Sequence, residues 1–328
     1  MNSHNVAVVG ATGAVGREMQ KTLEERDFPY NKLKLIATER SAGKKFKIKG
    51  KEHVVEAIKP GIFEDIDIAL FSIGSSPSKE IVPQAVKEGA VVIDNSNAFR
   101  MDDNVPLVVP EINSEEIKNN NGIIANPNCS TIQMVVVLKP LYDMAGIKRI
   151  VVNTYQAVSG TGKAAIDELD KQVRDYVNNK ELKSEVYPHQ IAFNILPHID
   201  VFFDNGYTKE EMKMVRETRK ILNDDKLAIT ATAVRVPVFY GHSEAVNIEL
   251  EEDITTDELR KSLQETEGIK IVDEYPVTIM TENDDDVLVG RIRRDNSIEN
   301  GFNLWVVANN LRKGAALNAV QIAEKLVK

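Results

Sequence analysis

The single cysteine of the chain, Cys129, lies at a corner between two sequence patterns. A β-branched run over 123–125 ends at Asn126-Pro127, and an apolar pattern with helical spacing begins at Thr131. The unpaired N–H groups and the positive dipole end of a helix that starts here would lower the pKa of the thiol from about 8.5 toward neutrality. This position predicts a nucleophile. The alternative is a buried cysteine that acts as a small apolar side chain.

Three further polar residues lie near the ends of predicted strands. His242 lies in a predicted turn before a strand, and imidazole, with an ordinary pKa near 6.5, exchanges protons near neutrality. His189 and His198 remain alternatives for this role. Gln156 ends a β-branched segment, where its amide either orients an acyl group beside the thiol or caps the strand. Arg235 lies between apolar residues, which requires an internal ion pair or a ligand such as a carboxylate.

A glycine-rich turn occupies the beginning of the chain, between a strand pattern and the start of a helix. Glycines at such a turn let the backbone approach a pyrophosphate at the helix N-terminus, although the Gly-x-x-Gly-x-x-Gly spacing differs from the usual first-turn pattern. The alternative is a glycine turn with no ligand. We expect a dinucleotide to be bound here by Gly10, Thr12, Gly13, Ala14, Val15 and Gly16.

The segment after the second predicted strand indicates which dinucleotide is bound. An acidic residue at this point binds the ribose 2′-hydroxyl of NAD, whereas basic and hydroxyl groups bind the 2′-phosphate of NADP. The sequence has Arg40 and Ser41 here, with Lys44 close behind, which favours NADP. Glu39 keeps NAD as one alternative. The other alternative is a solvated basic turn that binds no cofactor.

Composition narrows the class of protein. The chain has 328 residues, of which 42% are hydrophobic and 28% charged, enough for two domains with buried cores. Its 41 basic and 50 acidic residues give a net charge of −9, which argues against a nucleic-acid partner. The sequence shows neither a long apolar run nor a charged-then-apolar leader, and one cysteine cannot form an internal disulfide. We expect a cytoplasmic protein without a membrane partner, and no metal site is predicted.

Strand and helix patterns alternate from residue 6 to about residue 125 and predict a doubly wound, Rossmann-type parallel sheet. The expected strands are 6–9, 33–37, 66–73, 91–94 and 123–125, with helices over 14–26 and 78–87. A different pattern follows, with helices over 164–178 and 209–222 and strands over 150–155, 228–236, 244–251, 286–293 and 302–308. We expect this part to form an α+β domain with an antiparallel sheet.

A final amphipathic helix is predicted over 311–327. We expect it to return to the first domain. The predicted domains are therefore 1–127 plus 311–328 for the cofactor, and 128–310 for catalysis and dimerisation.

Four motifs together resemble aspartate-semialdehyde dehydrogenases. They are the glycine turn at 10–16, Asn126-Pro-Asn-Cys-Ser-Thr131, Tyr155-Gln156-Ala-Val-Ser159-Gly160, and the segment from Arg235 to Ser243. They occur in the expected order, and the likeness continues to the helix that contains Asn318, so it covers essentially the whole chain.

The resemblance implies NADPH-dependent reductive dephosphorylation of L-aspartyl-4-phosphate to L-aspartate 4-semialdehyde and phosphate. This step leads to lysine or diaminopimelate, threonine, methionine and isoleucine, and the enzyme is expected to be a homodimer. Cys129 would form a thioester, and His242 would act as base toward the thiol and acid toward the intermediate. The remaining site residues implied are Gln156 beside the acyl group, Arg235 for the α-carboxylate, Arg100 and Lys213 for phosphate, Glu210 or its neighbour Glu211 for the amino group, and Ser159, Gly160 and Asn318 for the cofactor.

Two other functions remain open at this point. An N-acetyl-γ-glutamyl-phosphate reductase would have a similar architecture, but its acetylated substrate would not need the carboxylate of Glu210. A non-catalytic dinucleotide sensor would keep the glycine turn, but it has no need for a thiol at a helix start.

Overall fold

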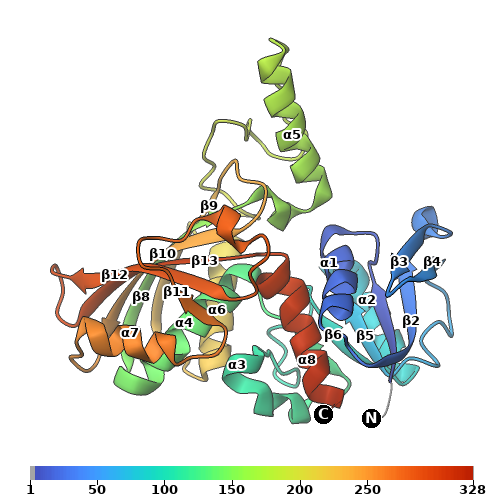
Figure 1. Ribbon diagram of the computed structural model, residues 1–328, viewed down its shortest axis with the longest axis horizontal. Helices are drawn as coiled ribbons and strands as arrows, with labels where there is room; N and C mark the ends of the chain where they lie inside the picture. Colours follow the sequence, from blue (N-terminus) through green and yellow to red (C-terminus); the bar gives the residue numbers. More distant parts are fainter. Residues whose placement is uncertain (1–3, 328) are drawn as a thin grey trace. The chain divides into compact units, whose positions relative to one another are not determined.

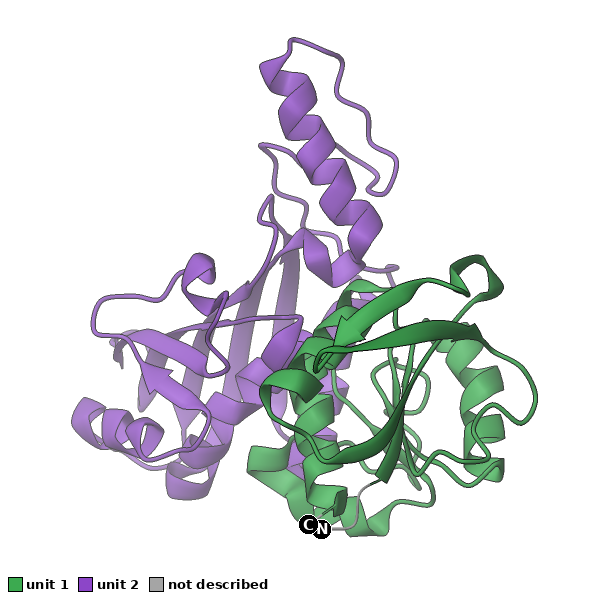
Figure 2. Cartoon of the chain, turned by 45° about the vertical axis from the view of Figure 1, so that its right-hand side comes forward, with its two compact units in different colours: residues 1–128, 315–328 green, residues 129–314 purple. Residues whose placement is uncertain are grey.

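The computed structural model describes residues 4–327, which form two compact units (Figure 2). Unit 1 comprises the described residues up to 128 and from 315 onward, and unit 2 comprises residues 129–314. Within residues 4–327, no helix combines the length and the apolar character that crossing a membrane requires.

Unit 1 is built on a seven-stranded sheet with the order β3-β4-β2-β1-β5-β6-β7 (Figure 1). Its strands are β1 (His4–Val9), β2 (Tyr30–Ala37), β3 (Lys45–Ile48), β4 (Lys51–Ala57), β5 (Ile68–Phe71), β6 (Val91–Asp94) and β7 (Ile123–Ala125). All neighbouring strands are parallel except β3 and β4, which form an antiparallel hairpin. The predicted doubly wound parallel sheet is confirmed. The hairpin was not predicted, because its charged strands, of which β3 is the edge of the sheet, lack the apolar runs of buried parallel strands.

Helices cover both faces of this sheet. Alternate side chains of β1 belong to different hydrophobic clusters, so the strand is buried on both sides. Helices α1 (Ala14–Glu25) and α8 (Leu317–Val327) contribute to one cluster, and α2 (Ser75–Lys87) contributes to the other. The C-terminal helix thus packs within unit 1. The connections contain the short helices η1 (Glu39–Ser41), α3 (Pro110–Asn113) and η2 (Ser114–Asn119).

Unit 2 contains a six-stranded sheet with the order β11-β12-β13-β10-β8-β9. Its strands are β8 (Ile147–Gln156), β9 (Ala228–Arg235), β10 (His242–Leu250), β11 (Ile269–Ile271), β12 (Val287–Asp295) and β13 (Gly301–Ala308). The expected antiparallel pairing is found in the centre of the sheet, where β10 pairs with β8 and β13, and β13 with β12. The outer pairs differ from the expectation, because β8 pairs with β9, and β11 with β12, in parallel. The chain between β8 and β9 includes two helices, and such a long crossover returns the chain in the same direction.

The helices of unit 2 are α4 (Cys129–Ala145), α5 (Lys163–Val177), α6 (Lys209–Leu222) and α7 (Thr256–Gln264), with short η3 (Val158–Thr161) and η4 (Thr278–Thr281). Helix α4 is buried over nearly all of its first three turns, and it packs against α6, α7 and the central strands. It begins at Cys129 itself, whereas the apolar pattern predicted a start at Thr131, because the polar first turn is buried as well. Helix α5 projects from the rest of unit 2 (Figure 1).

The predicted C-terminal helix consists of two segments. A π-helical turn, η5, covers Arg312–Ala316, and α8 follows it. The N–H of Gly314 donates to the carbonyl of Asn309 at 3.1 Å, an i to i−5 bond that widens the turn. Apolar periodicity cannot distinguish this wider turn from the start of the α-helix.

Candidate active site

Cys129 is half-buried at the first residue of α4. The strand β7 and the Asn126-Pro127 corner precede it in sequence, as the pattern predicted. Helix α4 contacts His242 one turn after its start, since Nε2 of Gln133 donates to the His242 carbonyl at 3.5 Å. The nucleophile candidate and the acid–base candidate therefore lie on adjacent elements of unit 2.

Gly314 packs directly against Cys129. A Cβ at position 314 would lie 2.8 Å from the Cβ and 3.2 Å from the Cα of Cys129. Carbon atoms in contact are normally 3.5–4.0 Å apart. Only glycine therefore allows η5 to approach the start of α4 this closely.

His242 is fully buried at the first residue of β10. The N–H of Ala157 donates to its Nδ1 at 3.0 Å, which assigns the ring proton of the neutral imidazole to Nε2. Burial, with a further contribution from the Arg235 charge, lowers the pKa of His242 from 6.5 to about 3. The imidazole is therefore neutral at physiological pH, and its Nε2–H has no acceptor among residues 4–327.

Ala157 connects His242 to Arg235. While its N–H bonds the histidine, its carbonyl accepts from Nη1 of Arg235 at 2.6 Å. The guanidinium carbon lies 6.0 Å from the centre of the Tyr187 ring. A Cβ at Gly160 would meet Arg235 Nη1 at 3.0 Å and His242 Nε2 at 3.3 Å. Gly160, expected to contact the cofactor, is thus also the close neighbour of both side chains.

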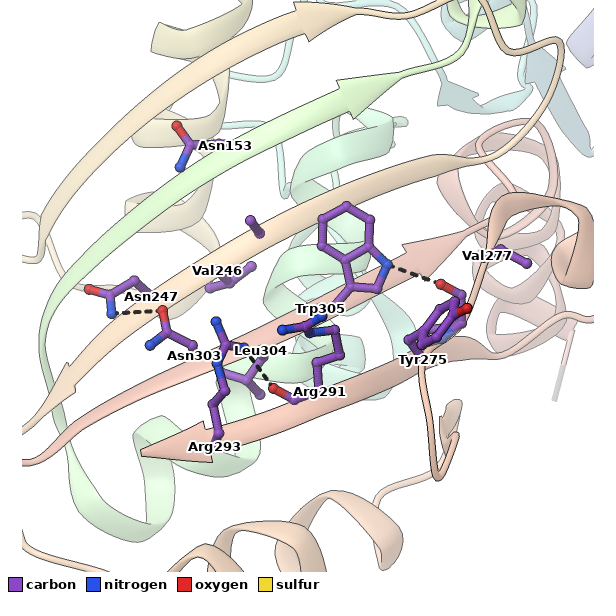
Figure 3. A pocket seen from close by; sticks show the side chains of 12 residues that line it. Asn153, Val246, Asn247, Tyr275, Val277, Arg291, Arg293, Asn303, Leu304 and Trp305 are labelled. Atoms are coloured by element: carbon purple, nitrogen blue, oxygen red, sulfur yellow. Dashed lines mark hydrogen bonds between the residues drawn. The ribbon is translucent and has the colours of Figure 1, made fainter. Parts of the chain in front are cut away.

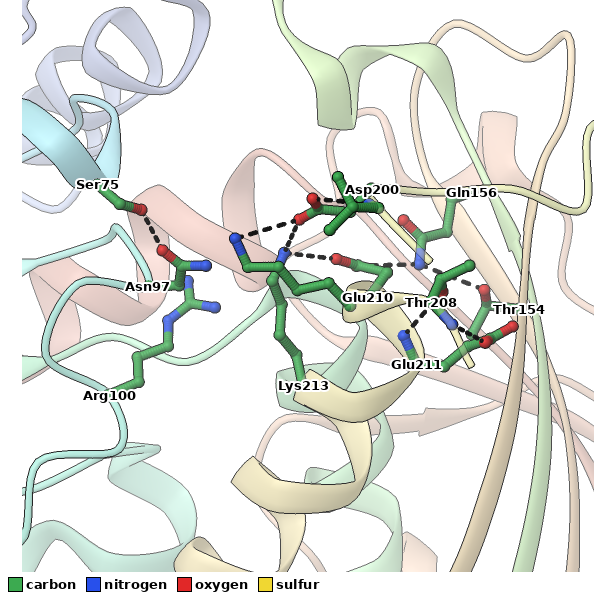
Figure 4. Close-up of polar contacts among 12 residues, drawn as sticks. Ser75, Asn97, Arg100, Thr154, Gln156, Asp200, Thr208, Glu210, Glu211 and Lys213 are labelled. Atoms are coloured by element: carbon green, nitrogen blue, oxygen red, sulfur yellow. Dashed lines mark hydrogen bonds and ion pairs between the residues drawn. The ribbon is translucent and has the colours of Figure 1, made fainter. Parts of the chain in front are cut away.

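A second polar chain runs from β8 to helix α6 (Figure 4). The Gln156 amide donates to Glu210 Oε1 at 3.3 Å, and Lys213 Nζ donates to Glu210 Oε2 at 2.9 Å and to Asp200 Oδ2 at 3.1 Å. Glu210 and Asp200 together raise the pKa of Lys213 against the opposing effect of burial. The structure therefore brings together three of the predicted substrate residues, and it adds Asp200.

The structure distinguishes Glu210 from Glu211. Both oxygens of Glu211 accept backbone N–H groups, from Thr208 at 2.6 Å and Ala233 at 2.9 Å. Glu211 also forms a capping box with Thr208 at the start of α6. Because its carboxylate is occupied in this way, Glu210 is the residue of the two that faces Gln156.

Asn310 holds the loop that carries Ser159 near the start of β10. Its Nδ2 donates to Ser159 Oγ at 3.0 Å, and its Oδ1 accepts from the N–H of Gly241 at 2.9 Å. Both Ser159 and Asn310 are buried. Asn310 therefore links Ser159 to Gly241, the residue before His242.

The glycine turn of unit 1 has the form required for a pyrophosphate. Gly10 has a φ of +86°, and a Cβ there would lie 2.2 Å from the carbonyl oxygen of Ser72. A Cβ at Gly16 would lie 2.2 Å from the carbonyl oxygen of Gly10. Gly13 precedes α1 and provides no side-chain cap, so the first N–H groups of the helix face the turn. The residues fit a bound dinucleotide.

The candidate 2′-phosphate residues lie beside this turn. Arg40 is exposed in η1, which follows β2. Thr12 Oγ1 donates to Ser41 Oγ at 3.3 Å, which joins the glycine turn to η1. The end of β2 and the turn after β1 thus form one surface of unit 1.

Arg100 and Asn318 are both buried in unit 1. Arg100 donates from Nε to the carbonyl of Asn126 at 2.8 Å and from Nη2 to that of Asn95 at 2.9 Å. Asn318 Nδ2 donates to Asn126 Oδ1 at 2.7 Å and to the carbonyl of Val108 at 3.0 Å. Both side chains therefore support the corner that leads to Cys129. Their expected roles toward phosphate and cofactor stay predictions.

A separate pocket lies on the sheet face of unit 2 (Figure 3). Trp305 forms part of it, and its Nε1–H donates to the carbonyl of Pro276 at 3.0 Å. Strand β10 contributes Ala245, Val246 and Asn247 to it, whereas His242 is not among its lining residues. This pocket therefore belongs to a different surface from the candidate active site.

Sequence analysis missed Ala157, Gly314, Asn310 and Asp200. Ala157 acts through its backbone, and Gly314 acts through the absence of a side chain, so neither residue type signals its role. Asp200 has a φ of +68° in a loop, and no local pattern connects it to Lys213. Only Asn310 could have been found from the sequence, because the pair Asn309-Asn310 directly follows a predicted strand.

Two domain families match most of the sequence. Residues 5–120 match the semialdehyde dehydrogenase NAD binding domain, and residues 138–313 match the semialdehyde dehydrogenase dimerisation domain. With the parallel sheet and the glycine turn, these matches define an oxidoreductase of the semialdehyde dehydrogenase class.

Three relatives narrow this class. The aspartate-semialdehyde dehydrogenase of Aquifex aeolicus (strain VF5) is 58% identical over 334 residues, which cover 99% of this chain and 98% of that protein. The crystal structure of aspartate semialdehyde dehydrogenase II from Vibrio cholerae, complexed with ASA, covers 100% of this chain and 99% of its own with a TM-score of 0.98 and 51% identity. That of the Candida albicans enzyme with NADP covers 99% of each chain with a TM-score of 0.78 and 26% identity. The chain belongs to the aspartate-semialdehyde dehydrogenase family.

Proposed function

We propose that the protein catalyses the NADPH-dependent reductive dephosphorylation of L-aspartyl-4-phosphate to L-aspartate 4-semialdehyde and phosphate. The observation that carries this proposal is the hydrogen-bonded arrangement in which one residue, Ala157, bonds both His242 and Arg235. It holds an imidazole and a guanidinium group at one place in unit 2, whose helix α4 starts with Cys129.

Cys129 is the proposed nucleophile. Its thiolate attacks the acyl carbon of the substrate, a C–S bond forms, and the bond from that carbon to the phosphate oxygen breaks as phosphate leaves. NADPH, when bound, supplies the hydride that reduces the resulting thioester. The C–S bond then breaks, which releases the aldehyde and regenerates the thiolate. The N-terminus of α4 stabilises the negative sulfur in both of its thiolate states.

His242 acts as a hydrogen-bond donor in this scheme. Because Nδ1 already accepts from Ala157, the Nε2–H is the group available to the developing oxyanion on the acyl carbon. The buried imidazole is neutral, so it stabilises this charge without bringing a charge of its own. The base role toward the thiol, expected from the sequence, is not favoured by this tautomer.

The two charged groups on the α-carbon of the substrate each have a side chain of opposite charge. Arg235 binds the α-carboxylate through its planar fork, and Glu210 binds the α-ammonium group. In the structure Lys213 forms an ion pair with Glu210, so the ammonium group displaces the lysine, which then binds phosphate. Arg100 of unit 1 is the other residue proposed to bind phosphate. Gln156, hydrogen-bonded to Glu210, orients the acyl group.

The cofactor is proposed to be NADP and not NAD. The glycine turn and the first N–H groups of α1 bind the pyrophosphate, and Arg40 with Ser41 binds the 2′-phosphate. The Candida albicans relative was solved with NADP, which supports this choice.

The protein is proposed to be a cytoplasmic homodimer that assembles through unit 2, which matches the dimerisation domain. The open sheet face near Trp305 carries aromatic side chains, since Tyr155 and Trp305 have ring centres 5.5 Å apart. Such a face suits a partner surface. The product would serve the biosynthesis of lysine or diaminopimelate, threonine, methionine and isoleucine.

The test is phosphate-dependent reduction of NADP with L-aspartate 4-semialdehyde, the reverse reaction. We expect turnover with wild-type protein and none with Cys129→Ser, which should still fold and bind NADPH, because a hydroxyl is a far poorer nucleophile. Turnover of N-acetylglutamate semialdehyde in its place would assign the related reductase activity. NADPH binding without turnover of either substrate would indicate a sensor.

A further inference from the structure

Glu244 is a buried acid that the proposed reaction does not use. It is 0% exposed and lies two residues after His242 on β10, on the same face of the strand. Neither of its carboxyl oxygens has a hydrogen-bond donor among residues 4–327. Its partners across the sheet are Thr154 of β8 and Val306 of β13, which carry no charge.

Gln133 is the polar neighbour of Glu244. It lies on α4, one helical turn after Cys129, and it donates from Nε2 to the His242 carbonyl at 3.5 Å. Its Oε1 is also buried without a donor in the described part of the chain. Burial raises the pKa of Glu244 well above its ordinary value, and the neighbouring Gln133 side chain opposes this rise only in part.

The environment thus contains three buried acceptor oxygens and one amide donor group. An ionised carboxylate would leave the carboxyl and amide oxygens unsatisfied and the charge without a partner, both of which are costly in an apolar interior. A proton on the carboxyl supplies the missing donor. A carboxylic acid and a primary amide can then exchange two hydrogen bonds, O–H to Oε1 and N–H to the acid oxygen.

We propose that Glu244 keeps its proton in the folded protein and pairs with Gln133, and that this pair positions the His242 strand against the helix that begins at Cys129. Glu244 is a positioning residue, because it acts on the reaction through the placement of His242 and Cys129. The predicted effect of Glu244 on turnover depends on the proposed function, whereas the predicted protonation of Glu244 does not depend on it.

The first test is the pH dependence of folding in Glu244→Gln, which replaces the acid by a neutral amide of the same shape. In the unfolded chain a glutamate loses its proton near pH 4.3, whereas the folded wild type retains it. Wild-type stability should therefore fall relative to Glu244→Gln as the pH rises. The ratio of the two folding constants, from urea unfolding between pH 5 and 7, should change about tenfold per pH unit.

Glu249→Gln is the matched control, since Glu249 is a partly exposed acid on the same strand. Its folding constant should follow the wild type across this pH range. The other titratable side chains at this place, His242 on the same strand and Cys129 at the start of α4, are present in every protein compared. Parallel pH profiles for wild type and Glu244→Gln would overturn the retained proton.

The second test concerns position. Alkylation of Cys129 by iodoacetamide should be slowed or accelerated at least threefold in Glu244→Ala and unchanged within error in Glu244→Gln. Turnover should follow the same order. If Glu244→Ala does not fold, Gln133→Met separates the pair with little change of volume and should shift the alkylation rate likewise. Equal alkylation in all variants would overturn the positioning role. Absence of turnover in the wild type would refute only the proposed function, because neither alkylation nor unfolding requires it.

Discussion

Substitution of Gly314 by alanine should disable the nucleophile without unfolding the protein. The added Cβ would lie 2.8 Å from the Cβ of Cys129, which is about 1 Å inside normal carbon contact. Since α4 is buried along most of its length, the strain is relieved most easily at its first residue, which carries the thiol. A misplacement of about 1 Å at a reacting group costs roughly 100-fold in rate, or about 2.7 kcal/mol in the barrier.

The backbone itself should tolerate the alanine. Gly314 is not among the glycines with positive φ, and alanine favours helical conformations over glycine by roughly 0.5–1 kcal/mol. We therefore expect Gly314→Ala to unfold near the wild-type temperature and to bind NADPH normally. The assay is the maximal rate of phosphate-dependent NADP reduction, together with the rate of iodoacetamide alkylation of Cys129.

Gly74→Ala is the matched control, because a Cβ there would meet only Pro77, at 3.7 Å, an ordinary contact. It should retain the wild-type alkylation rate. If Gly314→Ala kept both full turnover and normal alkylation, the close approach of η5 would not control the position of the thiol. If it lost NADPH binding to the same extent as turnover, the damage would be to the fold.

Four further predictions follow from the site. Arg40→Ala should weaken NADPH by about tenfold or more in fluorescence titration and leave NADH nearly unchanged, because only the 2′-phosphate loses a charge-assisted bond; equal losses would contradict this. Arg235→Lys should raise KM for the semialdehyde far more than KM for phosphate, since lysine loses the planar fork. Asp200→Asn should lower KM for phosphate by removing an anion that competes for Lys213, and a higher KM would refute the competition. His242 has a pKa lowered to about 3, so the unfolded state binds an extra proton below pH 6.5. Wild-type stability should therefore fall relative to His242→Asn by roughly 1.4 kcal/mol per pH unit as the pH drops from 6.5 toward 4, measured by urea unfolding.

Much of the fold was predictable because its signals are local. The parallel strands of unit 1 are short β-branched runs separated by amphipathic helices, and this alternation permits few arrangements. The charged hairpin of β3 and β4 gave no such signal. The mixed direction of the second sheet could not be predicted either, because it depends on which strands become neighbours after long connections.

The sequence by itself determined the chemical inventory of this protein: one thiol at a helix start, a glycine turn after the first strand, and an arginine and a histidine beside strand ends. These features depend on residue type and on neighbours within a few positions. Only the tertiary structure decided how they act. It places the N–H of Ala157 on Nδ1 of His242, Glu210 rather than Glu211 toward Gln156, and Gly314 against the thiol-bearing residue. These contacts join residues far apart in the chain, and their chemistry depends on burial and distance, which no local pattern encodes.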